Sequence, residues 1–95
     1  MRVHYRERAL ADLDEIFQYI DKRSPGGARN VIDAISAAVN AIAEHPLGAR
    51  ETSSPHIHVK VVRRYQYKIF YLVGADQVEI LHVRHGARRP WYPEN

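Results

Sequence analysis

The sequence predicts an α+β fold of the order β-α-α-β-β-β, in which an N-terminal strand and a helical hairpin pack on one face of an antiparallel sheet. Apolar residues recur at helical spacing through the first half of the chain, and the period changes to two from about residue 56. The last strands are joined by links short enough for an antiparallel meander. The 95 residues are expected to form a single domain, 1–95.

The first elements are a strand and an amphipathic helix. Residues 2–5, RVHY, are β-prone and predict one short strand. From about Arg6, apolar side chains occupy one helical face and acidic side chains the other. The apolar positions are Leu10, Leu13, Ile16, Phe17 and Ile20. Ser24-Pro25 ends this helix, because the residue before a proline disfavours helical dihedrals.

The same two residues predict the start of a second helix. Ser24 can cap its free N–H groups, and Pro25 suits the first helical position. The helix is expected to stop near residue 44, before His45-Pro46. Its apolar face is Ala28, Val31, Ile32, Ile35, Val39 and Ile42. Further alanines permit close packing, so the two helices are predicted to form an αα-hairpin.

The second half reads as a loop followed by three strands. Residues 47–55 are rich in turn formers, and residues 67–73, YKIFYLV, are apolar on both faces, which predicts a central strand. Residues 78–83, VEILHV, form the last strand. In the strand before the central one, Ile57, Val59 and Val61 alternate with His56, His58 and Lys60. We expect this polar set to line the sheet face that the helices leave uncovered.

Composition excludes several kinds of chemistry. The chain has no cysteine, so disulfides and thiolate catalysis are excluded. No run of about 18 apolar residues and no apolar secretion signal occurs, so a cytoplasmic protein without a membrane partner is expected. The sequence lacks a glycine-rich phosphate loop, and no cofactor is expected. His82 and His85 would point to opposite faces of a regular strand, and no metal site is predicted.

Positive charge is concentrated in the second half. Residues 1–55 carry 7 Lys and Arg against 8 Asp and Glu, whereas residues 56–95 carry 7 against 3. This basic set is either a solvated face or a surface that binds an anionic partner, such as single-stranded RNA. The residues expected to bind a target are Arg63, Arg64, Arg84, His85, Arg88, Arg89 and Trp91.

The element order, the segment YKIFYLVGADQVEILHVRHGARR and the acidic helix ALADLDEIFQYI resemble the RelE/ParE superfamily of type II toxin–antitoxin toxins. The HGAR ending, residues 85–88, and the Asp-rich first helix are more similar to ParE-like than to RelE-like members. The ParE-like resemblance implies a plasmid-stabilising toxin that arrests growth by binding and inhibiting DNA gyrase, without a recognised catalytic set.

A RelE-like resemblance implies a different activity. Such a toxin is a metal-independent endoribonuclease that cuts mRNA in the ribosomal A site. The residues that this alternative implies are His58, Lys60, Lys68, Arg88 and Tyr92. Lys68 stands where a central-strand arginine is usual, and lysine lacks the planar fork that grips a phosphate.

Both resemblances imply a cognate antitoxin, which is ParD-like in the preferred interpretation. We expect its C-terminal segment to dock in the groove between the helical hairpin and the sheet. The residues expected to contact it are Leu13, Phe17, Ile20 and Tyr71. Operator DNA would be bound only through the antitoxin, because the chain shows no DNA-binding element of the antitoxin type.

Overall fold

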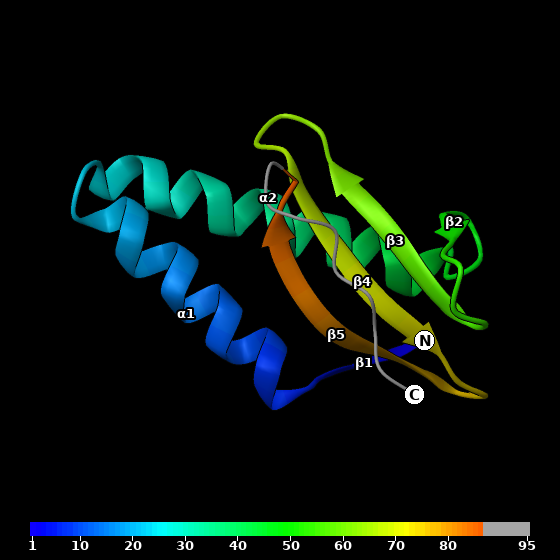
Figure 1. Ribbon diagram of the computed structural model, residues 1–95. Helices are drawn as coiled ribbons and strands as arrows, with labels where there is room; N and C mark the ends of the chain where they lie inside the picture. The colour runs from blue at the N-terminus through cyan, green and yellow to red at the C-terminus, as the bar shows by residue number, and fades with distance from the viewer. Residues whose placement is uncertain (87–95) are drawn as a thin grey trace.

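The structure, a computed structural model, describes residues 1–86 (Figure 1). Its elements are β1 (Arg2–Tyr5), α1 (Glu7–Asp21), α2 (Pro25–Glu44), β2 (Arg50–Glu51), β3 (Ile57–Val62), β4 (Tyr67–Val73) and β5 (Gln77–His85). The strands form one sheet in the order β1-β5-β4-β3-β2. Both helices lie on one face of it, α1 beside β5 and α2 behind the middle of the sheet (Figure 1). The predicted α+β fold is confirmed.

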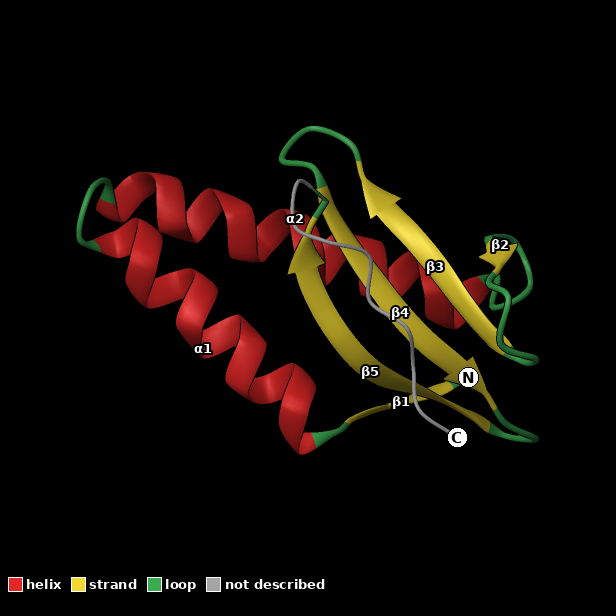
Figure 2. Cartoon of the chain, in the orientation of Figure 1, coloured by secondary structure: helices red, strands yellow, loops and turns green. Residues whose placement is uncertain are grey.

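Two details of the sheet differ from the predicted antiparallel arrangement. β1 pairs with β5 in parallel, from Arg2 opposite Gln77 to Tyr5 opposite Ile80. The helical hairpin and the other strands separate β1 from β5 in the chain, as Figure 2 shows, so no tight turn forces an antiparallel direction. The second detail is β2, a two-residue strand that pairs with β3 and lay within the predicted loop.

The helical hairpin forms where Ser24 and Pro25, which end one helix and begin the next, predict it. Ser24 Oγ accepts a hydrogen bond from the N–H of Gly27 at 3.2 Å, and Pro25 is the first residue of α2. A Cβ atom on Gly27 would lie 2.8 Å from Ser24 Oγ, so this cap is built tightly around a glycine. α1 begins after Arg6 without a side-chain cap. Of residues 1–86, neither helix is both long and apolar enough to cross a bilayer.

The main core lies between the hairpin and the sheet. It contains Ala9, Val31, Ile35, Val39, Ile42, Val62, Tyr67, Ile69, Tyr71, Val78, Ile80 and Val83. Tyr71 is fully buried, and its hydroxyl donates to the carbonyl of Pro46 at 2.7 Å. Its ring stacks on that of His58 at 5.4 Å, and His58 Nδ1 lies 3.0 Å from the carbonyl of Ala49. These contacts fix the loop after α2 to the sheet.

A second apolar cluster lies on the face away from the helices. Val59, Phe70 and Leu81 are each less than a tenth exposed, and Ile57 and Leu72 pack against them. The β4–β5 register shifts at this point, which adds Leu81 to the cluster as the extra residue of a β-bulge. No helix covers this face, as predicted, but its centre is apolar where the sequence analysis expected polar side chains.

The polar side chains of β3 face the other way from the prediction. His58 is paired with Tyr71 and Lys60 with Ile69, so both lie on the helix side of the sheet. Ile57, Val59 and Val61 lie on the face away from the helices. The expectation that His58 and Lys60 line the face away from the helices is wrong. Period two predicts the alternation but not which half of it meets the core.

Tyr71→Phe tests the tie between the sheet and the loop after α2. We expect it to lower the free energy of unfolding by about 1 kcal/mol, because the carbonyl of Pro46 loses its donor. Tyr19→Phe is the matched control, since Tyr19 is 62% exposed, and should change stability by less than about 0.5 kcal/mol. Urea unfolding of both variants measures this, and equal effects would contradict it.

Candidate functional site

The carboxylates of the segment from β3 to β5 lie at the start of β5. Asp76, in the turn before β5, forms an ion pair with Arg2 at 3.0 Å. Glu79 forms another with Arg6 at 2.7 Å. These are the two acidic residues between positions 56 and 86, and both pair with cations from the N-terminal segment. The opposite end of the sheet therefore has no carboxylate of its own.

That opposite end is basic, and we call it the cationic end: Arg63, Arg64, Lys68, Arg84 and His85. Arg63 and Arg64 belong to the turn that links β3 to β4, while Arg84 and His85 end β5. Lys68 is paired directly with Arg84 across the β4–β5 ladder, on the face away from the helices. Two positively charged side chains therefore lie side by side on this face of the sheet.

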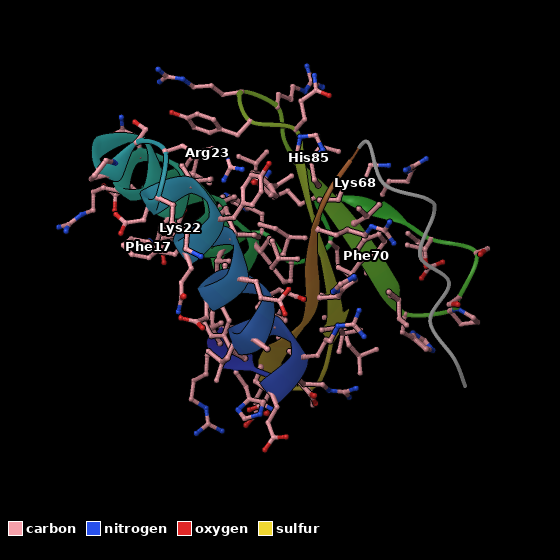
Figure 3. All side chains as sticks on the ribbon, turned by 60° about the vertical axis from the view of Figure 1, so that its left-hand side comes forward. Phe17, Lys22, Arg23, Lys68, Phe70 and His85 are labelled. Atoms are coloured by element: carbon pink, nitrogen blue, oxygen red, sulfur yellow. The ribbon has the colours of Figure 1, made fainter. Side chains whose placement is uncertain are left out.

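A hollow opens at the cationic end on this face, and we call it the cationic hollow. It is lined by Val61, Arg63, Gln66, Lys68 and Gly86 and has a volume of about 370 Å³. Figure 3 shows Lys68 on the side of the sheet away from the helices. Of its described lining residues, none is acidic. Two cations and an amide therefore surround an open space suited to an anion.

The backbone shapes this hollow through one turn residue and one glycine. Gln66 has a positive φ of 61°, which turns the chain into β4. Its carbonyl accepts a hydrogen bond from the N–H of Gly86 at 2.6 Å. A Cβ atom at position 86 would lie 3.0 Å from that same oxygen, so glycine lets the end of β5 approach the turn closely.

Asp12 connects α1 to β5 beside the cationic end. The β1–β5 pairing stops at Ile80, and beyond it the Asp12 carboxylate accepts the N–H of Val83 at 2.9 Å and contacts His82 Nδ1 at 2.5 Å. Arg8 lies 3.6 Å from the same carboxylate. Sequence reasoning counted Asp12 only as part of an acidic helix face. The i,i+4 spacing from Arg8 was its one local signal, and it does not predict a contact with β5.

The surroundings of His82 lower its pKa. Burial lowers the pKa of His82 below the ordinary 6.5, and the hydrogen bond and charge of Asp12 oppose this shift only in part. The positive charges of Arg8 and Arg84 lower it further. Because an ionised carboxylate can only accept, Nδ1 of the neutral ring is the donor to Asp12.

A groove runs between α1 and β5, with a volume of about 450 Å³. It is lined by Asp12, Glu15, Ile16, Tyr19, Tyr67, Val83, Arg84 and His85. Of the residues expected to contact an antitoxin, Leu13 and Ile20 pack partly buried against the core, and Phe17 is 38% exposed. Tyr71 is fully buried, so its side chain offers a partner no surface. Sequence reasoning missed both Glu15, which it counted only as part of the polar face of the helix, and Tyr19, which it did not single out.

Of the residues implied by a ribonuclease, the three within positions 1–86 do not come together. His58 is buried on the helix side, where it stacks on Tyr71, and Lys60 lies on the same side. Lys68 lies on the opposite face. Arg88 and Tyr92 lie outside the described residues. The part of the chain that the structure describes therefore offers no single surface that gathers this set.

The residues expected to bind a target are better grouped. Arg63, Arg64 and Arg84 all lie at the cationic end. His85 lies on its helix side, with its ring edge-on to that of Tyr67 at 5.3 Å. The remaining three, Arg88, Arg89 and Trp91, lie outside the described residues. Within positions 1–86, no three His, Asp or Glu side chains are placed to hold a metal ion.

A helical hairpin on one face of a mixed sheet, with a cationic sheet end, defines a small α+β protein of the RelE/ParE type. The chain belongs to the family described as "ParE toxin of type II toxin-antitoxin system, parDE", whose sequence model matches residues 3–90. The "Putative toxin Y4kP" of Sinorhizobium fredii is 39% identical over 95% of this chain and 92% of its own length. "Toxin RelE2" of Caulobacter vibrioides is 36% identical over 85% and 90%.

A solved structure supports the same fold. A chain of the chromosomal ParDE toxin–antitoxin system from P. aeruginosa superposes with a TM-score of 0.79, covering 90% of this chain and 95% of that one, at 20% identity. Membership of a toxin–antitoxin family implies that a cognate antitoxin is a partner of this chain.

Stability should depend on pH through His82. Below about pH 6.5 the unfolded chain binds a proton that native His82 resists, so the free energy of unfolding should fall on acidification from about pH 7.5 to about pH 5.5. His82→Gln should remove part of this slope. Unfolding curves at each pH measure the slopes. A wild-type protein that becomes more stable than His82→Gln on acidification would show that Asp12, not burial, dominates the pKa.

Proposed function

We propose that this toxin arrests growth in the cytoplasm by binding and inhibiting DNA gyrase, in the ParE-like manner, with the cationic end as part of its contact surface. The observation that carries the proposal is the grouping of Arg63, Arg64, Lys68 and Arg84 at one sheet end. Such a surface favours association with an anionic partner and adds to the rate of encounter.

The division of the ribonuclease set supports binding over catalysis. Phosphodiester cleavage without a metal needs a general base and cations converging on one phosphate. His58 and Lys60 face the helix side and Lys68 the other, so these three groups cannot reach one phosphate together. The RelE-like alternative keeps the support of the relative named RelE2, and the experiment below includes it.

We also propose a ParD-like antitoxin that covers α1 and the groove beside β5. Phe17 is large and apolar, yet it is 38% exposed. Leu10 lies two helical turns before it on the same face of α1 and is 53% exposed. Acidic residues surround them, namely Glu7, Asp14 and Asp21. An amphipathic segment with apolar positions and basic flanks would match this surface. Recognition of the operator sequence would come through this partner.

Purified toxin added in parallel to a gyrase supercoiling assay and to programmed ribosomes separates the two activities. We expect loss of supercoiling with accumulation of cleaved DNA–gyrase complexes, and intact mRNA on the ribosomes. Replacing Lys68 with glutamine should weaken gyrase inhibition about tenfold by removing one charged contact. Cuts in A-site mRNA with active gyrase would overturn the proposal in favour of the RelE-like alternative.

Phe17→Glu tests the antitoxin surface. It places a charge where an apolar contact is expected, so affinity for the antitoxin should fall at least about tenfold while growth arrest persists. Ser36→Glu, at an exposed position of α2, is the matched control and should be neutralised like the wild type. Titration calorimetry and rescue of growth by co-expressed antitoxin measure the two effects. Full neutralisation of Phe17→Glu would remove α1 from the interface.

A further inference from the structure

We infer that the cationic hollow binds a backbone phosphate of duplex DNA, so that the toxin contacts DNA directly and not only through a protein partner. The inference rests on the proposed function only for the place where the DNA contact would occur, because gyrase holds duplex DNA. The binding itself would be a property of this chain alone, and it can be measured without gyrase.

The hollow is built from donors that residues 1–86 leave without an acidic partner. Neither Arg63 nor Lys68 takes part in an ion pair within this range, although Arg2, Arg6, Arg8 and Arg29 each do. Gln66 adds a side-chain amide to the same lining. Guanidinium, ammonium and amide groups are the side chains that proteins use to hold phosphate oxygens.

The cations form a row rather than a single point. Arg63 lies in the turn after β3, Lys68 lies on β4, and Arg84 is opposite Lys68 on β5. Adjacent strands are about 4.8 Å apart, so this row spans two strands and the turn beside them. A polymer with regularly spaced negative charges fits such a row better than one isolated anion does.

The described aromatic side chains favour a duplex over a single strand. Single-stranded nucleic acid is held by bases that stack on exposed rings. Tyr67 lies on the helix side, and Phe70 is buried in the second cluster. Tyr65 is partly buried against the main core, with the Arg64 guanidinium 5.3 Å from its ring centre. Within residues 1–86, the rings near the hollow are thus buried or partly buried, which suits a duplex backbone better than stacked single-stranded bases.

The glycine that ends β5 gives the hollow its shape. Gly86 lines it, and an added Cβ atom would meet the Gln66 carbonyl at 3.0 Å and Lys68 Cε at 3.6 Å. A side chain at position 86 would therefore push against the residues that hold the anion. The close approach leaves room at the surface for a phosphate.

Fluorescence anisotropy of a short labelled DNA duplex, with the full chain and no gyrase, tests the inference. Affinity should fall steeply as salt rises from about 50 to 200 mM, and a single strand of the same length should bind more weakly. Lys68→Gln and Arg63→Gln should each lose about three- to tenfold in affinity and lower the salt slope by about one. Lys22→Gln and Arg29→Gln, exposed on the helical hairpin and matched in charge, should bind like the wild type.

Circular dichroism of every variant shows that a loss of binding is not a loss of fold. The inference is overturned if the wild type does not bind the duplex, if Lys68→Gln and Arg63→Gln bind as tightly as their controls, or if the single strand binds more tightly. It is also overturned if both variants lose affinity for DNA-free gyrase while duplex binding is unchanged, since the hollow would then bind an acidic protein surface. Duplex binding without gyrase inhibition would leave the inference standing and remove the proposed function.

Discussion

The burial of both faces of β4 is the constraint on which the rest of the structure depends. Ile69 and Tyr71 face the helical hairpin, while Phe70 packs with Val59 and Leu81 on the other side. The middle of the sheet is apolar on both faces, and unpaired charge is costly there. On β4 the one charged side chain, Lys68, therefore lies near the strand end, where function is expected to lie.

The two ends of the sheet then differ in chemistry. At the start of β5, Asp76 and Glu79 are matched by arginines from the N-terminal segment. At the end of β5, positively charged side chains lie close together, and the described strands supply no carboxylate there. α1 carries five acidic residues and one arginine, so the molecule has an acidic helix and a basic sheet end. This polarity suits two partners of opposite character on two separate surfaces, in line with a toxin that has both a target and an antitoxin.

Local sequence patterns predict where the arginines of the candidate site lie, but they do not predict the placement of His58 or Asp12. The gathering of Arg63, Arg64 and Arg84 was predictable, because each flanks a strand end that the sequence marks with turn residues. The placement of His58 was not, since alternation is symmetric between the two faces of a strand. Asp12 was equally invisible, because its partners lie about 70 residues away in β5.

The sequence by itself determined the element order, the ends of both helices and the basic character of the last strands, because caps, prolines and periodicity act over a few residues. Only the tertiary structure decided that β1 joins β5 in parallel, that Lys60 and Lys68 lie on opposite faces, and that Gly86 closes on Gln66. Those outcomes depend on register and on which face the hairpin covers. Both are set by packing between segments far apart in the chain, where no local pattern of residues can specify them.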